Sequence, residues 1–215
     1  MRACIFGAGE YHGEGLALCE GALILAADGG LAYCDAYGLS PTLAIGDFDS
    51  LGRIPEGVEV IRHPVEKDDT DMALAVSEAR LRGADEIFLL GALGGRLDHT
   101  LANITLLRAL SRAGCASYIL GERETLTVIG AGERLTFSGE PDGVFSLFAL
   151  TDRAILSVSG AQYPLCSGTL YASPALGVSN HFQKTKAEIT VESGEVLLVW
   201  ESQNAPMPRR EALGG

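Results

Sequence analysis

The first 120 residues alternate short apolar runs with helix-like segments, and this alternation limits the fold more than any other feature of the sequence. The apolar runs are four to six residues long and are bounded by Gly, Asp or Pro, as is typical of buried parallel strands. They are Arg2–Phe6, Ala22–Ala27, Thr42–Ile45, Val58–Arg62, Glu86–Leu90 and Ser117–Leu120. Strands that alternate with helices predict a doubly wound, mostly parallel α/β domain.

Two segments between these runs have the apolar periodicity of helices, and each is followed by a glycine that acts as a stop signal. The first segment, Asp71–Arg82, forms one apolar face from Met72, Ala75, Val76 and Ala79. The second segment, His99–Arg112, forms a stripe from Leu101, Ile104, Thr105 and Arg108, with Leu106, Leu107 and Leu110 beside it. Both faces are expected to pack on the sheet.

The pattern changes after Gly121 to alternating segments of strand length, separated by Gly, Ser and Pro. These segments are Leu126–Ile129, Arg134–Phe137, Val144–Leu150, Ala154–Val158, Thr169–Ala172, Ala187–Val191 and Val196–Trp200. They predict a small antiparallel β-sandwich, with Trp200 packed in its core. We therefore expect an α/β domain over residues 1–122, a sandwich over 123–201 and a flexible tail over 202–215.

The composition narrows the classes of function. The chain has 28 Asp and Glu against 16 Lys and Arg, a net charge of −12, so it is a poor match for a nucleic-acid backbone. A phosphate substrate would also be repelled unless a cation mediates its binding.

The sequence has no apolar stretch of about 20 residues and no signal-peptide pattern at MRACIFGAGE. Five scattered cysteines without CxxC are typical of reduced thiols. We expect a cytoplasmic protein without nucleic-acid or membrane partners.

Glycine-rich and acidic motifs follow several of the predicted strands. Asp28 closes the second strand, Gly46-Asp47 closes the third, and residues 91–98 follow the fifth. The first strand leads into GAGEYHG, a weak dinucleotide fingerprint because His12 stands where the third glycine belongs. Ligands of open α/β sheets bind beyond the carboxyl ends of the strands. The motifs therefore predict one site at that edge.

Three acidic clusters supply the chemistry of this site: GDFDS at 46–50, KDDTD at 67–71 and GGRLDH at 94–99. Their six aspartates are Asp47, Asp49, Asp68, Asp69, Asp71 and Asp98. Carboxylate oxygens with few histidines or paired cysteines suit Mg²⁺ rather than zinc. Because Mg²⁺ usually shares its coordination shell with substrate phosphates, the clusters predict an enzyme that handles a nucleoside triphosphate.

The first two clusters each allow more than one interpretation. Asp47 and Asp49 are about 6.6 Å apart along an extended chain, so they bind one Mg²⁺ after a bend, two metals, or one metal through water. They could also form a solvated turn. In KDDTD, Asp69 or Thr70 can cap the following helix. Lys67 can offset the acids or reach a phosphate.

The third cluster adds groups that suit phosphate. Gly94 and Gly95 let backbone amides approach a phosphate closely, and Arg96 can form two hydrogen bonds to phosphate oxygens. Asp98 can cap the helix instead of serving the site. His99 either contacts the phosphate or base, or fills the first helical turn.

The motifs ADGG, GDFDS, KDDTD and GGRLDH, in this order and spacing, resemble those of the thiamine pyrophosphokinase family. The resemblance continues in Gln162-Tyr163-Pro164-Leu165 and Gly177-Val178-Ser179-Asn180, and covers roughly residues 3–200. It implies transfer of the diphosphate group of ATP to the hydroxyl of thiamine, giving thiamine diphosphate and AMP. It also implies a Mg²⁺- and ATP-binding α/β domain, a thiamine-binding sandwich, and a homodimer with sites at the subunit interface.

The resemblance also implies roles for residues that match the family motifs. Asp47, Asp49 and Asp71 would bind Mg²⁺, and together with Asp28, Asp98 and Arg96 would surround the reacting groups. ATP would lie near Lys67, Asp68, Thr70, Gly94, Gly95 and His99, although family members vary at the positions of Lys67 and Asp68. Thiamine would lie near Tyr163, Ser179 and Asn180. The resemblance leaves open whether Asp71 or Asp98 accepts the proton of the thiamine hydroxyl.

Two other classes of function fit parts of the pattern. GDFDS alone also suits a metal-dependent phosphohydrolase or a nucleotide-sugar transferase. A non-catalytic module that senses thiamine or a nucleotide is the second alternative, although such a module would not need so dense a set of carboxylates.

Overall fold

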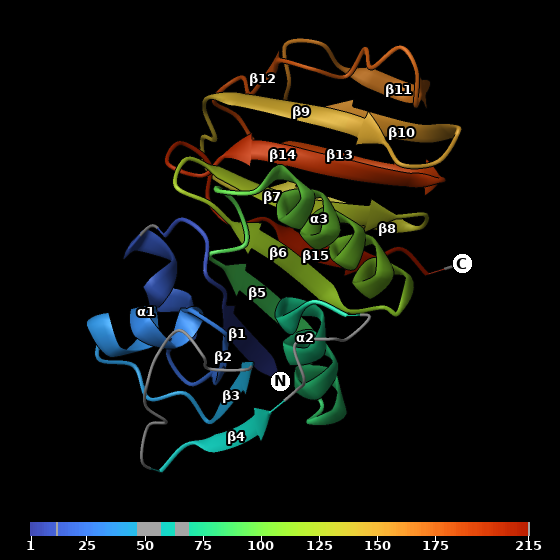
Figure 1. Ribbon diagram of the computed structural model, residues 1–215. Helices are drawn as coiled ribbons and strands as arrows, with labels where there is room; N and C mark the ends of the chain where they lie inside the picture. The colour runs from blue at the N-terminus through green and yellow to red at the C-terminus, as the bar shows by residue number, and fades with distance from the viewer. Residues whose placement is uncertain (12, 47–56, 63–68, 215) are drawn as a thin grey trace. The chain divides into compact units, whose positions relative to one another are not determined.

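The structure, a computed structural model, describes residues 1–11, 13–46, 57–62 and 69–214. The chain forms two compact units, Met1–Glu122 and Arg123–Gly215 (Figure 1). The predicted Asp47, Asp49, Lys67 and Asp68 lie outside the described residues.

The first unit contains a parallel sheet in the order β6-β5-β1-β2-β3-β4. Its strands are β1 Arg2–Phe6, β2 Leu23–Ala27, β3 Leu43–Gly46, β4 Glu59–Arg62, β5 Glu86–Leu90 and β6 Ala116–Leu120. The prediction of a mostly parallel α/β domain is confirmed. In β1, β3 and β5 at least four residues in a row are buried, which explains why these strands are apolar runs without alternation.

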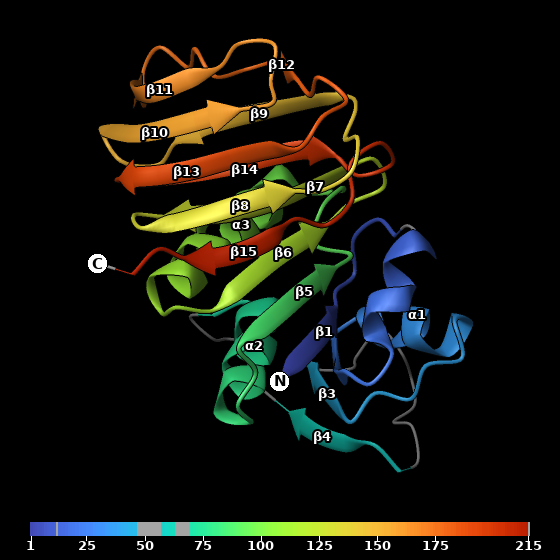
Figure 2. The ribbon, with the colours of Figure 1, turned by 180° about the vertical axis from the view of Figure 1, so that it is seen from behind.

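The helices of the first unit are the 3-10 helix η1 Gly13–Cys19 and the α-helices α1 Gly30–Ala36, α2 Asp71–Leu81 and α3 Leu97–Arg112. Figures 1 and 2 show α2 and α3 on one face of the parallel sheet. The buried residues of α2 are the four predicted ones, Met72, Ala75, Val76 and Ala79. None of the helices among the described residues is long and apolar enough to cross a membrane.

The predicted apolar side of α3 is confirmed at Leu107 and Leu110, but its central stripe is wrong. Leu101 is 55% exposed and Thr105 is also exposed, whereas the buried residues of the helix are Asn103, Leu107 and Leu110. The helix is therefore rotated relative to the prediction. The buried face includes a polar residue, which apolar periodicity does not detect.

The second unit contains two antiparallel sheets, in the orders β12-β9-β14-β7 and β11-β10-β13-β8-β15. The first sheet comprises β7 Glu124–Gly130, β9 Val144–Ala149, β12 Asn180–His181 and β14 Glu195–Glu201. The second comprises β8 Glu133–Phe137, β10 Arg153–Ser159, β11 Leu165–Tyr171, β13 Ala187–Ser193 and β15 Arg209–Ala212. Burial alternates along β9 and β10, as expected for sheets with one buried face.

Aromatic side chains form the core of the second unit. Phe182 lies between Phe137 and Phe145, with ring centroids 4.9 and 4.6 Å away. The Trp200 ring meets Phe137 edge-on at 5.5 Å and is 1% exposed. Trp200 is thus a core residue, as the sequence predicted.

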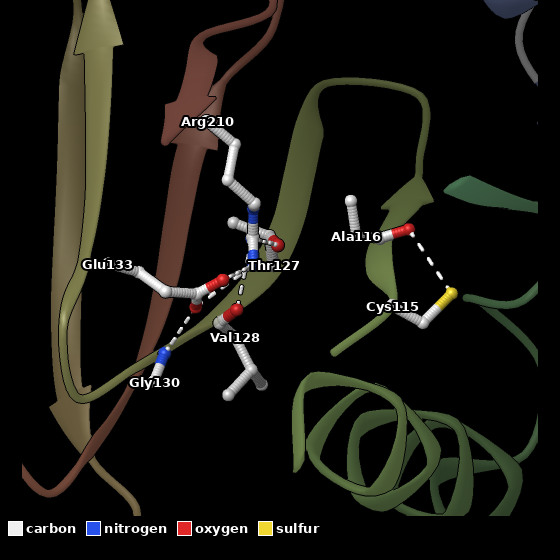
Figure 3. Close-up of polar contacts among 7 residues, drawn as sticks. All are labelled: Cys115, Ala116, Thr127, Val128, Gly130, Glu133 and Arg210. Atoms are coloured by element: carbon white, nitrogen blue, oxygen red, sulfur yellow. Dashed lines mark hydrogen bonds and ion pairs between the residues drawn. The ribbon is translucent and has the colours of Figure 1, made fainter. Parts of the chain in front are cut away.

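The sequence analysis expected residues 202–215 to form a flexible tail. The structure corrects this expectation, because residues Arg209–Ala212 form β15 and pair with β8. Arg210 anchors this strand: one guanidinium nitrogen lies 3.2 Å from both carboxylate oxygens of Glu133. The other donates to Thr127 Oγ1 at 2.5 Å and to the Val128 carbonyl at 3.0 Å (Figure 3). The Arg210 side chain is only 11% exposed, so the contacts of a largely buried side chain hold β15 in place.

The five cysteines are free thiols, and all except Cys166 are buried. Burial raises the pKa of the Cys34 thiol to about 12, so this group stays protonated at neutral pH. The Cys115 sulfur lies 3.7 Å from the Ala116 carbonyl oxygen (Figure 3). Thiols of this kind behave as small apolar core residues.

Candidate functional site

A cavity of about 300 Å³ lies at the carboxyl ends of β1, β2 and β5 in the first unit. Three glycine-bearing or acidic segments, 7–9, 27–28 and 91–96, form much of its wall, together with Thr70, Asp71, Met72, His99 and Asn103. The structure therefore brings Asp28, Thr70, Asp71, Gly94, Gly95, Arg96 and His99 to one cavity. Asp98 does not line it.

Asp28 reaches the cavity through an unusual backbone conformation. Its φ is +47°, a left-handed region that aspartate tolerates better than most residues. Its N–H donates to the Ile45 carbonyl at 2.7 Å, which ties the end of β2 to β3. A Cβ on Gly46 would lie 3.1 Å from Asp28 Cα, so the start of GDFDS passes close to Asp28.

Thr70 is the N-cap of α2. Its Oγ1 accepts a hydrogen bond from the Ala73 N–H at 3.2 Å, and Asp71 follows as the first helical residue. Of the two capping candidates in KDDTD, Thr70 is therefore the cap. The cap fixes where α2 begins, and so fixes the backbone that carries Asp71 at the cavity wall.

The loop after β5 is tied to the loop after β1 by three backbone hydrogen bonds. The N–H groups of Gly7, Gly9 and Glu10 donate to the carbonyls of Leu90, Gly91 and Leu93 at 2.8, 2.8 and 2.9 Å. A Cβ on Gly9 would lie 2.3 Å from the Leu93 carbonyl oxygen, so only glycine allows this approach. The glycine-rich first turn thus serves to bring two backbones together.

The amide groups of the second loop remain available. Within the described part of the chain, the N–H groups of Ala92, Leu93, Gly94 and Gly95 donate no hydrogen bond. Gly94 and Gly95 have φ values of +82° and +65°, which suit glycine and allow successive amides to converge. Such a run of backbone donors at a cavity wall suits an anion.

Arg96 is paired with Asp98 by two hydrogen bonds. Its Nε donates to Oδ1 at 3.1 Å and its Nη2 donates to Oδ2 at 2.6 Å. The hydrogen bond from Arg96 lowers the pKa of Asp98, and the His99 N–H, which donates to the same carboxylate at 3.0 Å, lowers it further. Asp98 is therefore a weak proton acceptor in this arrangement.

Two residues of the site escaped the sequence analysis. Asn103, which is 7% exposed, lies four residues after His99 on the same face of α3 and donates from Nδ2 to the Ala92 carbonyl at 2.7 Å. Its signal was a polar residue four positions after a motif histidine, on the same face of a predicted helix. The second is Tyr11, whose hydroxyl donates to the Gly7 carbonyl.

Tyr11 packs against two of the glycines that line the cavity, Gly7 and Gly91. Its ring stacks on Tyr33 with a centroid distance of 3.6 Å, and a Cβ on Gly91 would lie 2.5 Å from that ring. Burial raises the pKa of the Tyr11 hydroxyl, so it remains a donor. The sequence around Tyr11 contains no motif or periodicity that predicts its packing on Tyr33 and Gly91.

In the second unit the structure brings Asn180 and the Tyr163 backbone together. Asn180 is 9% exposed; its Oδ1 accepts from the Tyr163 N–H at 3.0 Å, and its Nδ2 donates to the Tyr163 carbonyl at 2.9 Å. Ser179, with φ of +60°, donates its N–H to Ser146 Oγ at 3.1 Å. The Tyr163 side chain is 61% exposed, so its ring is accessible on the unit's surface.

Comparisons with known proteins agree with these features. Residues 17–119 match the family model for the thiamin pyrophosphokinase catalytic domain, and residues 134–196 match the model for the thiamin pyrophosphokinase vitamin B1 binding domain. A thiamine pyrophosphokinase of Bacillus subtilis is 26% identical over 187 residues, covering 84% of this chain and 87% of that protein.

Solved structures show the same fold. The thiamin pyrophosphokinase of Geobacillus thermodenitrificans superposes with a TM-score of 0.82 at 26% identity, over 94% of this chain and 98% of that one. The Candida albicans enzyme gives a TM-score of 0.78 at 16% identity, over 94% and 90% of the two chains.

Proposed function

The chain belongs to the thiamine pyrophosphokinase family, and from this premise we propose how its residues serve the reaction. The enzyme transfers the diphosphate group of ATP to the hydroxyl of thiamine, giving thiamine diphosphate and AMP. The bond between the α- and β-phosphates breaks while the thiamine oxygen bonds to the β-phosphorus, and the hydroxyl proton passes to a base.

The phosphates of ATP bind at the loop after β5. The observation that carries this proposal is the run of N–H groups from Ala92 to Gly95, which line the cavity and donate no hydrogen bond within the described residues. Backbone donors in fixed positions stabilise phosphate charge without reorganisation. His99 and Thr70, on the same cavity wall, flank the nucleotide.

Mg²⁺ is the cofactor that this site suits. Asp28 and Asp71 offer carboxylate oxygens to the same cavity as the phosphate-binding loop, and Mg²⁺ prefers such oxygens together with substrate phosphates. Asp71 would hold the ion with Asp47 and Asp49, which lie outside the described residues. When bound, Mg²⁺ supplies charge neutralisation to the transferring phosphates.

Asp71 is the stronger candidate for the base. It lines the cavity, whereas Asp98 does not and has its pKa lowered by Arg96. Arg96 offsets the charge on the transferring group, and Asp98 holds the guanidinium at the cavity wall until a phosphate replaces the carboxylate.

Thiamine binds at Tyr163 and Ser179 of the second unit. The exposed Tyr163 ring can stack on an aromatic ring of the substrate, and Asn180 holds the backbone of that tyrosine. Asn180 is also expected to lie near thiamine, because its Nδ2 carries a second N–H besides the one that donates to the Tyr163 carbonyl.

The functional state is a homodimer with active sites at the subunit interface. The second unit exposes apolar side chains along β11 and towards β12: Tyr163, Leu165, Tyr171, Leu176 and Val178. Exposed apolar side chains concentrated in one segment of the chain fit an interaction surface. We also propose a cytoplasmic location, since free thiols persist in reducing compartments; fractionation of cells would test it.

Incubation with thiamine, ATP and Mg²⁺ tests the function, with AMP and thiamine diphosphate quantified over time. Equal amounts of the two products, lost on chelation and restored by Mg²⁺, are expected. Release of inorganic phosphate without thiamine diphosphate would favour a phosphohydrolase. Thiamine binding in calorimetry without turnover would favour a sensing module. Sedimentation of the active sample would check the dimer.

A further inference from the structure

The carbonyl groups of the phosphate-binding loop are held in two different ways. Those of Leu90, Gly91 and Leu93 accept from backbone N–H groups of residues 7–10. The carbonyl of Ala92 instead accepts from a side chain, the Nδ2 of Asn103 at 2.7 Å. The orientation of the Ala92–Leu93 peptide therefore depends on one residue of α3.

This hydrogen bond fixes the direction of an amide donor. In a planar trans peptide the carbonyl of one residue and the N–H of the next point in opposite directions. Because Asn103 holds the Ala92 carbonyl, it also sets the direction of the Leu93 N–H, which donates no hydrogen bond to any other described residue. The peptides on either side are held through the Gly91 and Leu93 carbonyls by the N–H groups of Gly9 and Glu10, and among the described residues Asn103 supplies the corresponding bond for this peptide.

The surroundings of Asn103 strengthen the constraint. The residue is 7% exposed, so its amide would be left unsatisfied if it lost this partner, which disfavours any other orientation of the side chain. Leu107, one turn further along α3, is fully buried, so the helix face that carries Asn103 is anchored in the core. The side chain therefore transmits the position of a rigid helix to the Ala92–Leu93 peptide.

We propose that Asn103 is a positioning residue for nucleotide binding: its amide holds the Ala92–Leu93 peptide so that the Leu93 N–H can donate to a phosphate oxygen of ATP. The proposal rests on the proposed function. It assigns to Asn103 an effect on ATP affinity that acts through the loop backbone, with thiamine affinity unaffected.

The test measures the affinity of the full chain for Mg·ATP by calorimetry, alongside steady-state kinetics. Asn103→Leu keeps the side-chain volume but removes the donor, and Asn103→Ala serves as a second variant if leucine disturbs packing. Thr105→Ala is the matched control, because it removes a side-chain hydrogen bond to the Ala102 carbonyl on the exposed side of the same helix.

We expect both Asn103 variants to bind Mg·ATP about tenfold more weakly, with the KM for thiamine and kcat at saturating ATP within twofold of the wild type. Thr105→Ala should match the wild type. Affinity within twofold in both folded Asn103 variants would overturn the proposal. Equal losses for ATP and thiamine with a lower thermal midpoint would also overturn it, by showing a general structural role. A wild-type protein that binds no Mg·ATP would instead refute the proposed function.

Discussion

Asn180 and Tyr163 are joined by two hydrogen bonds that run in opposite directions, one to the N–H and one to the carbonyl of the tyrosine. The Asn180 amide thus bonds to both the N–H and the carbonyl of one backbone residue, as the backbone of a neighbouring β-strand would. Asn180 Oδ1 also accepts from the His181 N–H at 2.9 Å. This asparagine therefore fixes the start of the Tyr163–Leu165 segment, from which the exposed ring projects.

The Asn180→Asp variant should weaken thiamine binding. The carboxylate keeps an acceptor for the Tyr163 N–H, but it cannot donate to the Tyr163 carbonyl, which it would repel. We expect the KM for thiamine to rise about tenfold while the KM for ATP stays unchanged. Asn204→Asp is the control, since it makes the same change at an exposed residue. An unchanged KM for thiamine would show that Asn180 has no part in thiamine binding.

Replacing Arg96 by Gln should affect both turnover and the ionisation of Asp98. Loss of the guanidinium removes charge stabilisation, so kcat/KM should fall about 100-fold or more. The pKa of Asp98 should rise towards its ordinary value, because the hydrogen bond from Arg96 is the main cause of its lowering.

The sign of the pH effect follows from this lowered pKa. The ion pair stabilises the folded state at pH values above the ordinary range of aspartate, and that contribution is lost as the pH falls through the lowered pKa. Carboxyl NMR titration of the wild type and the Arg96→Gln variant measures the change. An Asp98 pKa that is the same in both proteins would contradict the pairing.

The Thr70→Ala variant should lose the N-cap of α2. The Ala73 N–H would lose its side-chain acceptor, at a cost of about 1 kcal/mol in the free energy of unfolding. Urea denaturation measures this change. Thr70→Ser keeps the hydroxyl and should retain most of the stability; if serine is as destabilising as alanine, the methyl group rather than the cap is responsible.

The Arg210→Ala variant should destabilise the second unit by about 2–3 kcal/mol, because the Glu133 carboxylate would lose its guanidinium partner and keep the hydrogen bond from the Gly130 N–H. This lies below the usual cost of breaking a fully buried pair, since the Glu133 side chain is 23% exposed. Arg209→Ala is the control: that side chain is 78% exposed, pairs with Glu211, and should contribute under about 1 kcal/mol. Equal effects in urea denaturation would rule out the anchoring role of Arg210.

Particular elements show how far the sequence could predict the structure. The buried face of α2 was predicted residue for residue because small and apolar side chains repeat at helical spacing. The face of α3 was predicted only at Leu107 and Leu110, because Asn103 is buried through a hydrogen bond to Ala92, a tertiary contact that apolar periodicity does not encode. Helix α1 was missed because its N-cap, Gly29, makes no side-chain hydrogen bond and the helix is short.

The candidate site shows a similar division. The motifs predicted that Asp28, Asp71 and Arg96 would meet at one edge of the sheet, because parallel strands place their carboxyl ends together. They did not predict that Asp98 would pair with Arg96 without lining the cavity itself. Strand β15 also escaped prediction, because its polar residues pair with β8 and its anchor contacts Glu133, far earlier in the chain.

The distant pairing of β15 has a consequence for the order of events on the ribosome. Strand β8 is synthesised more than 70 residues before Arg209–Ala212, so its edge and the Glu133 carboxylate emerge well before their partners. An open edge of this kind can pair with another chain. Nascent chains are therefore expected to need protection from misassembly until the closing strand leaves the exit tunnel.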